Sequence, residues 1–237
     1  MIVRSTTSRT AGVYWISDGA EPGIQLEEVV AIAHRHGVPV LLDASNTLPP
    51  AEHLHSFIDM GVDLVAFSGG KGLRGPQGSG ILAGRADLIR AARLQSAPLQ
   101  GIGRPLKVSK EEIVGLVTAL EVWADRDHEA DLRDARRRTD LVVERLAGVP
   151  GGRAEHRFLD HVGRPYATAF MHLDPATGRT AAGVIAALLA GEPSVATMPF
   201  SDPQIIRIDV RVLSDKEAEI VATELRRTLT MTRACSR

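Results

Sequence analysis

Short apolar runs alternate with stretches of helical periodicity through the first half of the chain. The expected strands are residues 13–16, 38–42, 63–67 and 80–84, and the expected helices are residues 26–36, 51–60 and 86–95. Strands that alternate with helices are typical of a mostly parallel sheet with helices packed on it. We therefore expect an α/β fold in which residues 13–16 form a buried strand and residues 38–42 and 63–67 form central strands buried on both faces.

The second half of the chain follows a loop rich in proline and glycine at residues 96–105. A capping-box pattern, Ser109-x-x-Glu112, then precedes a long helical stretch, which the charged residues 126–145 continue. Beyond residues 148–152 the pattern is that of a small α+β unit. Its expected elements are strands at residues 166–173, 194–198 and 205–209, a helix at residues 181–189, and a last helix behind a second capping box, Ser214-x-x-Glu217.

These patterns predict three regions along the chain. Residues 1–108 form a partial large domain with the mostly parallel sheet, residues 109–148 form an interdomain helical segment, and residues 149–237 form a small C-terminal α+β domain. Ligands of open α/β sheets bind outside the carboxyl ends of the strands. The candidate site therefore lies among the residues that end the strands of the first region.

Composition and charge narrow the class of protein. The chain has 237 residues with a formal net charge of -1, so it has no basic field for nucleic acid. Its apolar runs fall short of the roughly 20 residues of a membrane span, and its start has no apolar segment typical of a secretory signal. The single cysteine, Cys235, cannot build a disulfide framework, so we expect a reducing, cytoplasmic setting.

Two residues that follow expected strands carry candidate chemistry, namely Asp43 and Lys71. A lone aspartate at a strand end forms a turn or caps a helix about as often as it serves a functional role. Lys71, however, lies in a loop at residues 68–80 with little side-chain bulk, which indicates close approach of the backbone to something, and a ligand or cofactor is the natural candidate.

Nucleotide-binding motifs do not account for this loop. Its Gly70-Lys71-Gly72-Leu73-Arg74-Gly75 segment matches G-x-G-x-x-G formally, but Pro76 and later glycines disfavour the helix that a Rossmann site needs. A P-loop requires Ser or Thr after the lysine, where this chain has Gly72. We also expect no metal site at His34-x-His36 or His53-x-His55, because two side chains spaced i, i+2 do not share a helix face.

The chemistry of pyridoxal phosphate does account for Asp43 and Lys71 together. A lysine amine at the edge of a sheet can form a Schiff base with a carbonyl cofactor, and a nearby carboxylate can pair with a pyridinium nitrogen. The amine must be neutral to react, which a neighbouring cation favours, and Arg74 is a candidate for that cation.

The chain resembles the fold-type I pyridoxal-phosphate enzymes in two motifs. Pro22-Gly23 ahead of a helix, the segment at residues 33–44 and Leu48-Pro49-Pro50 are similar to the group as a whole. The segment at residues 63–77, with Ser68-Gly69-Gly70-Lys71-Gly72 at its centre, looks like the branch of selenocysteine synthase (L-seryl-tRNA selenium transferase) and D-glucosaminate-6-phosphate ammonia-lyase. Weaker similarity continues at residues 103–113, 191–193 and 206–209.

The resemblance implies roles for five residues. Lys71 would be the Schiff-base lysine and Asp43 the partner of the pyridine nitrogen, both catalytic and cofactor-binding. Ser68 matches a position that contacts the cofactor phosphate, and Ser45 falls near the residue that lies against the ring. Arg207 is a weaker match to a clamp for the substrate carboxylate. The alternatives for Ser45 and Arg207 are an ordinary turn residue and a surface strand arginine.

The implied activity is a pyridoxal-phosphate-dependent lyase or transferase that acts on an amino acid or amino sugar acid, as a cytoplasmic homodimer. Family members carry a front part of the large domain, with a phosphate-binding turn, ahead of the position that Val13 matches. The chain therefore reads as a truncated enzyme, as a catalytically inactive fragment, or as a non-enzymatic binding or oligomerisation module. A selenium transferase acting on seryl-tRNA is a further alternative, which the balanced charge disfavours.

Overall fold

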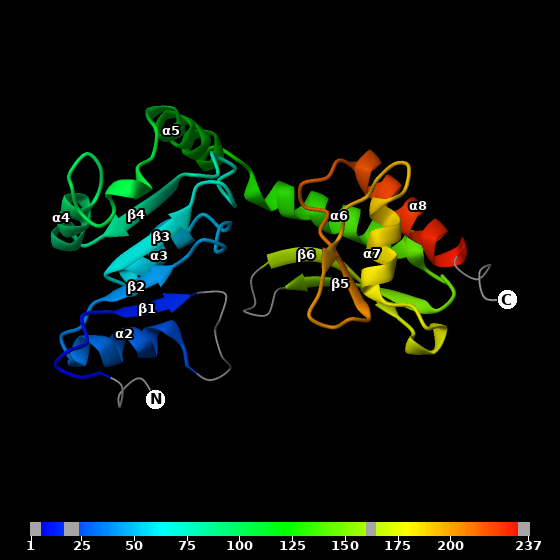
Figure 1. Cartoon of the computed structure of the whole chain (residues 1–237), viewed down its shortest axis with the longest axis horizontal. Coiled ribbons are helices and arrows are strands. Elements are labelled where there is room, and N and C mark those ends of the chain that lie inside the picture. The colour runs from blue at the N-terminus through cyan, green and yellow to red at the C-terminus, as the bar shows by residue number, and fades with distance from the viewer. Residues whose placement is uncertain (1–5, 17–23, 160–164, 232–237) are drawn as a thin grey trace. The chain divides into compact units, whose positions relative to one another are not determined.

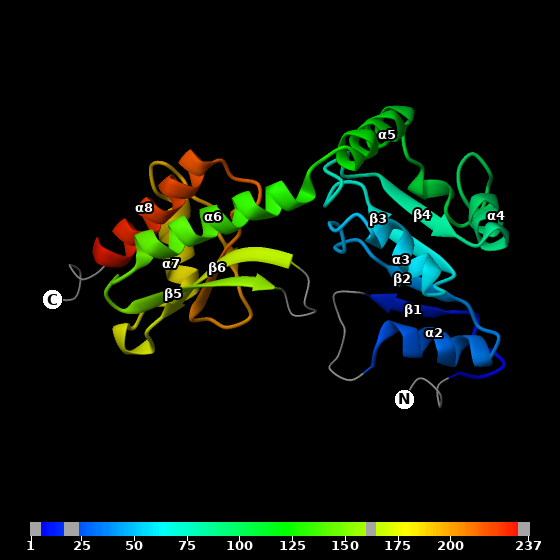
Figure 2. The ribbon, with the colours of Figure 1, turned by 180° about the vertical axis from the view of Figure 1, so that it is seen from behind.

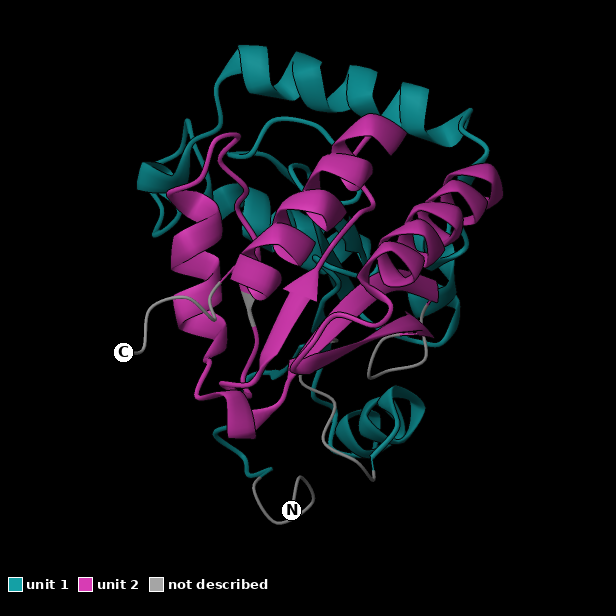
Figure 3. Cartoon of the chain, turned by 90° about the vertical axis from the view of Figure 1, so that its right-hand side faces the viewer, with its two compact units in different colours: residues 1–128 teal, residues 129–237 magenta. Residues whose placement is uncertain are grey.

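The computed structural model describes residues 6–16, 24–159 and 165–231, so Pro22-Gly23 and Cys235 lie outside the described residues. The chain divides into two compact units, residues 1–128 and 129–237 (Figure 3). The division falls inside the predicted interdomain segment.

A four-stranded sheet forms the centre of the first unit, with the strand order β1-β2-β3-β4 (Figure 1). Its strands are β1 (Val13–Ile16), β2 (Val40–Asp43), β3 (Leu64–Ser68) and β4 (Gly80–Gly84). The first three strands are parallel, and β4 pairs antiparallel with β3. The expected mostly parallel α/β sheet is therefore confirmed, and residues 71–79 form turns ahead of β4 rather than a helix.

Four α-helices accompany this sheet in the described part of the first unit. They are α2 (Leu26–Arg35), α3 (His53–Asp59), α4 (Ala86–Gln95) and α5 (Lys110–Ala124), with the short 3-10 turn η2 (Arg104–Leu106) ahead of α5. Gly37 follows α2 with φ +68°, a conformation that glycine adopts without strain. The capping box at Ser109 is present, because Glu112 N donates to Ser109 Oγ at 3.1 Å and Ser109 N donates to Glu112 Oε2 at 3.0 Å.

Only one face of this sheet is fully buried, which corrects the expectation for its strands. Val40, Leu42, Val65 and Phe67 alternate along β2 and β3 and pack with residues of α2, α3 and α5 in one cluster. The residues between them are half-buried, and β1 is not a buried strand, because Tyr14 and Ile16 are 58% and 47% exposed. Apolar runs predict burial but not which face of a strand is covered.

In its described residues, the second unit is a four-stranded antiparallel sheet with three α-helices (Figure 2). The strand order is β5-β6-β8-β7, with β5 (Gly152–Leu159), β6 (Pro165–Leu173), β7 (Met198–Pro199) and β8 (Ile205–Ile208). Its helices are α6 (His128–Leu146), α7 (Ala181–Leu189) and α8 (Asp215–Met231), with the 3-10 turn η3 (Pro175–Thr177) ahead of α7.

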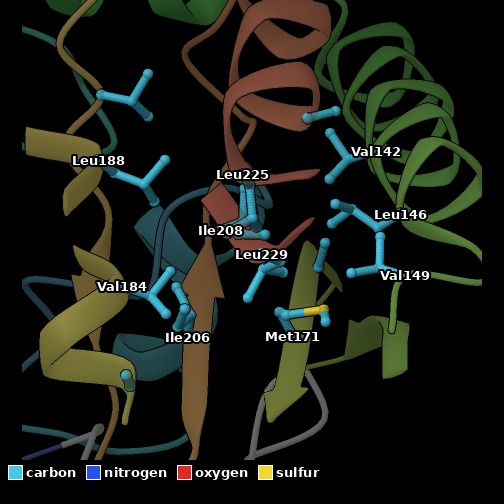
Figure 4. Packing of buried hydrophobic residues seen from close by; sticks show 14 of the residues in the cluster. Val142, Leu146, Val149, Met171, Val184, Leu188, Ile206, Ile208, Leu225 and Leu229 are labelled. Carbon is cyan, nitrogen blue, oxygen red and sulfur yellow. The ribbon is translucent and has the colours of Figure 1, made fainter. Parts of the chain in front are cut away.

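All three helices of the second unit pack on one face of its sheet. Figure 4 shows the buried cluster that joins them, in which Leu225 of α8 lies between Leu146 of α6 and Leu188 of α7, with Ile206 and Met171 of the sheet below. The predicted small α+β unit is therefore confirmed, together with its last capping box, since Ser214 N donates to Glu217 Oε2 at 2.7 Å.

The structure differs from the sequence analysis of the second half in three places, one missed strand and two corrected expectations. Strand β5 was not expected, because Gly152–Leu159 is rich in charged residues and has no apolar run. The strand expected at residues 194–198 is reduced to the end of that range, because Ser194 Oγ donates to Leu189 O at 2.7 Å and Val195 N to Leu188 O at 3.0 Å, which ends α7. The long helix breaks at residues 125–127, where two aspartates are unfavourable at the end of α5 and favourable at the start of α6.

Candidate functional site

Asp43 and Ser68 end two adjacent parallel strands, so they lie at one edge of the first unit's sheet. Asp43 pairs with Ala66, and side chains two apart share a face, so Asp43 and Ser68 project from the same face. Ser45 follows two residues after Asp43, and Lys71 follows three residues after Ser68. The fold therefore gathers four of the five predicted site residues at the position where α/β sheets bind ligands.

Hydrogen bonds connect Lys71 to Asp43 through Ser45. The exposed Lys71 Nζ donates to Ser45 Oγ at 3.1 Å, and Ser45 N donates to Asp43 Oδ1 at 3.0 Å. A reactive amine and a carboxylate thus lie on either side of one serine. Ser45, predicted to lie near a cofactor ring, contacts both of these groups in the structure.

Tyr14 joins this group, and the sequence had not indicated it. The Tyr14 hydroxyl donates to Asp43 Oδ2 at 2.9 Å across the first two strands. In the parallel register Tyr14 pairs with Leu41 and Ile16 with Asp43, so all four side chains share the face that is not fully buried. The alternation of residues along β1 and β2 would predict the contact between Tyr14 and Asp43 only if the register of the two strands were known.

The Asp43 carboxylate is held in its charged form. Burial alone would raise the pKa of Asp43, but hydrogen bonds from Ser45 and Tyr14 and the charge of Lys71 outweigh it and lower that pKa below its usual range. The same hydrogen bond to Asp43, with a smaller contribution from burial, raises the pKa of Tyr14. The site therefore presents a fixed negative charge beside a solvent-accessible amine.

The loop at residues 68–80, which we call the lysine loop, has no room for side chains at three of its glycines. A Cβ on Gly72 would collide with the carbonyl of Leu48, and one on Gly70 would lie 2.6 Å from Gln77 Oε1. A Cβ on Gly69 would collide with Ser79 Oγ. The low side-chain bulk of this loop is thus explained by internal packing, without a ligand.

Arg74, the candidate cation near the lysine, adopts φ +58° and lines a cavity of about 360 Å³ against α5. Lys71 is not among the residues that line this cavity, whereas Pro76, Trp123 and Arg126 are. The structure therefore places Arg74 in a cavity beside α5, among residues that do not include Lys71.

Arg207 lies in the second unit, on β8 between β6 and β7. It pairs with Phe170 on one side and Met198 on the other, and its Nη2 donates to Met198 Sδ at 2.9 Å. Its buried Nε has no hydrogen-bond partner among the described residues. An arginine with a free donor and no ion pair to a carboxylate of the described residues suits the binding of an anion.

One histidine of each pair makes a hydrogen bond within the first unit. His34 Nε2 lies 2.8 Å from Asp63 Oδ2, and His53 Nδ1 lies 2.9 Å from the carbonyl of Thr47. Within the described ranges, no group of three or more His, Cys, Asp or Glu side chains is arranged to hold a metal ion. A search of the same residues finds no helix long and apolar enough to cross a membrane.

Comparison with known proteins identifies the family of this site. The sequence profile of the aminotransferase class-V family matches residues 21–157, which is more than half of the chain and includes Asp43, Ser45, Ser68 and Lys71. The chain belongs to the aminotransferase class-V family. This is a family of fold-type I enzymes that typically use pyridoxal phosphate.

Relatives with described activities align along most of the chain. It is 33% identical to a 5'-C-glycyluridine monooxygenase-decarboxylase of a Streptomyces species over 94% of the chain and 55% of the relative. It is 27% identical to the D-glucosaminate-6-phosphate ammonia lyase of Salmonella typhimurium over 86% of the chain and 52% of the relative. The chain thus spans about half the length of these class-V relatives.

Solved structures show the same fold. A structure of D-glucosaminate-6-phosphate ammonia-lyase superimposes with a TM-score of 0.72 at 24% identity, and covers 96% of this chain and 59% of its own. The cysteine desulfurase CsdA of Escherichia coli superimposes with a TM-score of 0.59 at 21% identity, over 94% of this chain and 60% of its own. The predicted aminotransferase-like α/β fold and the predicted family are therefore confirmed.

The residues of this class-V chain fit two of the three groups that pyridoxal phosphate presents. An accessible amine on Lys71 suits an aldehyde, and the ionised Asp43 suits a cationic ring nitrogen. For the phosphate, the described residues offer Ser68 at the end of β3.

Proposed function

We propose that the protein is a pyridoxal-phosphate-dependent lyase or transferase that acts on an amino acid or amino sugar acid. One observation carries the proposal, namely that the Lys71 amine and the ionised Asp43 carboxylate are connected through Ser45 at the carboxyl edge of a parallel sheet. The ammonia lyase and the L-seryl-tRNA(Sec) selenium transferases among the relatives support this reaction class.

Each residue of the site has a defined task in this proposal. When bound, pyridoxal phosphate supplies an electron sink for cleavage of a bond at Cα of an amino substrate. Lys71 Nζ would hold the cofactor, and its free amine would accept the proton from Cα of the substrate. Asp43 pairs with the ring nitrogen and keeps it protonated, which the lowered pKa of Asp43 favours.

The remaining predicted residues bind and orient. Ser68 would hold the phosphate and Ser45 would lie near the ring, while the Ser45 hydroxyl accepts from Lys71 Nζ and so positions the amine. Arg207, whose Nε has no hydrogen-bond partner among the described residues, would pair with the carboxylate of the substrate. Every amino acid and every amino sugar acid offers the required amine and carboxylate.

A second candidate reaction follows from the relative of highest identity among those described above. The 33% identity with a monooxygenase-decarboxylase that acts on 5'-C-glycyluridine favours a substrate in which an amino acid is joined to a nucleoside. Loss of carbon dioxide from Cα uses the same lysine and aspartate as elimination does. Product analysis with each substrate class separates the two reactions.

The subunit arrangement is part of the proposal, with a cytoplasmic homodimer as its expected state. Helix α5 exposes a stripe of apolar side chains, Ile113, Val114 and Val117, with Lys110 at its start and Glu121 near its end. Two copies packed antiparallel along this stripe would place Lys110 of one copy beside Glu121 of the other. We propose a second copy of the chain as the occupant of this stripe.

The test of the cofactor proposal measures labelling of the protein by pyridoxal phosphate. We expect a new absorbance band, and borohydride reduction followed by peptide mass spectrometry should place the label on Lys71. Lys71→Ala removes the band, whereas the control Lys216→Ala keeps it because Lys216 lies on α8 of the second unit. Asp43→Asn should weaken binding, which distinguishes a site from general lysine labelling.

Two outcomes would contradict the proposed function. Labelling spread equally over the four lysines, Lys71, Lys107, Lys110 and Lys216, indicates a protein without a cofactor site and favours the inactive or non-enzymatic alternative. Tight binding of seryl-tRNA by the cofactor-loaded protein, with transfer of selenium from a selenium donor to the seryl group, would instead favour the selenium transferase.

A further inference from the structure

The contact between Tyr14 and Asp43 has no counterpart in the roles assigned above. Tyr14 lies on β1 and reaches diagonally to the carboxylate at the end of β2, with 2.9 Å between its hydroxyl and Asp43 Oδ2. Ser45 N occupies the other oxygen, Oδ1, at 3.0 Å. The carboxylate is therefore fixed at both oxygens, by one donor from a neighbouring strand and one from its own turn.

A carboxylate fixed in this way still has room for a third donor. An ionised carboxylate offers about four lone-pair sites, of which Tyr14 and Ser45 N use two. A cationic ring nitrogen can therefore bind Asp43 without displacing either donor. Preorganising a charged group before its partner arrives reduces the ordering cost of binding.

We propose that Tyr14 is a positioning residue, which holds the Asp43 carboxylate in orientation for the ring nitrogen of pyridoxal phosphate. The inference rests on the proposed function, because the ring nitrogen is the partner for which Asp43 is held. Among the described residues, the charged and titratable groups that act on the carboxylate are Tyr14 from β1 and Lys71 from the loop after β3, and Ser45 connects Lys71 to Asp43. Tyr14 itself does not contact the reacting atoms.

The chain contains a matched control for this contact. It has two tyrosines, and the second, Tyr166, also donates to an aspartate at 2.9 Å, namely Asp209 Oδ2. That pair lies in the second unit, where Arg211 donates to both Asp209 Oδ2 at 2.7 Å and the Tyr166 hydroxyl at 2.9 Å. Tyr166→Phe therefore makes the same chemical change at a tyrosine–aspartate pair that the proposal does not involve.

The first experiment uses the cofactor-free protein and the ultraviolet absorbance of tyrosinate. In Tyr166→Phe the remaining tyrosine is Tyr14, so the titration reports its phenol alone. We expect that phenol to ionise above about pH 10, and Asp43→Asn in the same background to bring its pKa back toward about 10. A Tyr14 titration that Asp43→Asn leaves unchanged would overturn the inference.

The second experiment measures cofactor affinity against pH. Tyr14→Phe should raise the Kd for pyridoxal phosphate about two- to tenfold, the range that one hydrogen bond of ordinary strength gives. Affinity should fall at low pH as Asp43 becomes protonated, and we call this part of the curve the acid limb. Tyr14→Phe should move the acid limb to higher pH, because Asp43 loses a donor that favours its charged form. Tyr166→Phe should change neither quantity.

The outcomes separate this inference from the function on which it rests. Lys71-dependent binding with an acid limb that Tyr14→Phe leaves in place overturns the role of Tyr14 alone. Absence of Lys71-dependent binding in the unaltered protein overturns the proposed function and this inference together. A shift of the acid limb in Tyr14→Phe and none in Tyr166→Phe supports both.

Discussion

Lys71 Nζ and Ser45 Oγ lie 3.1 Å apart, and this hydrogen bond directs an exposed amine toward the strand that ends in Asp43. Ser45→Ala removes the hydroxyl and keeps the backbone N–H that Asp43 accepts. We expect the Kd for pyridoxal phosphate to rise by about ten- to a hundredfold, since a hydrogen bond to a charged group contributes about 1.5–3 kcal/mol. Absorbance titration measures it, and complete loss of binding would contradict a positioning role.

Asp63 contributes to the stability of the first unit through its buried carboxylate, which is 4% exposed. It accepts from Val40 N and Arg85 Nη1 at 2.8 Å each, and His34 Nε2 lies at the same distance. Asp63→Ala leaves the Val40 N–H without a partner, so the free energy of unfolding should fall by about 1–3 kcal/mol. Urea denaturation measures this, and the control Asp87→Ala should change it by less than about 0.5 kcal/mol.

The stability that Asp63 provides should depend on pH in a defined direction. Burial would raise the pKa of Asp63, but hydrogen bonds from Arg85, His34 and Val40 N outweigh it, and the pKa in the folded protein is lowered. The contribution is therefore present above the unfolded value of about 3.9 and is lost as pH falls through the lower folded pKa. Asp63→Ala should flatten this part of the stability curve, and an unchanged curve would contradict the assignment.

Gly72 should not tolerate a side chain, because a Cβ there collides with the backbone carbonyl of Leu48. Gly72→Ala is expected to lower the free energy of unfolding by about 1–3 kcal/mol, the usual cost of overpacking. The control is Gly183→Ala in α7, whose Cβ would meet Thr180 Oγ1 at an ordinary 3.4 Å and should stabilise by about 0.5–1 kcal/mol. Equal effects of the two substitutions in urea denaturation would contradict the packing explanation.

The proposed dimer along α5 depends on the middle of its apolar stripe. Val117→Lys places a charge at that position, and we expect the protein to become monomeric in light scattering. Val212→Lys makes the same change at an exposed site of the second unit and should keep the dimer. A monomer before any substitution, or a dimer that survives Val117→Lys, would contradict the use of this stripe.

Local sequence patterns predicted much of the fold. The four strands of the first unit and the capping boxes at Ser109 and Ser214 follow from patterns within a few residues, and the structure contains them. Strand β5 had no such signal, because its alternating charged residues lie at the edge of the sheet. The burial of one face and not the other depends on which helices pack there, which no strand pattern contains.

The candidate site was likewise predicted only in part from the sequence. Asp43 and Lys71 were found because each follows an apolar run, which places them at strand ends. Tyr14 was missed because its contact with Asp43 joins residues 29 positions apart and needs the register of two strands. The chemistry of single residues was thus accessible from sequence, whereas the pairing that tunes them was not.

The glycines of the lysine loop determine which residues homologous proteins should retain if they lose catalysis. Gly69, Gly70 and Gly72 are required by Ser79, Gln77 and Leu48, which belong to the scaffold and not to any ligand. A lineage that replaced Lys71 and abandoned catalysis would still lose foldability on replacing these glycines. The loop should therefore keep its glycine signature long after its lysine, and a match to that signature alone marks shared ancestry of the scaffold rather than a working enzyme.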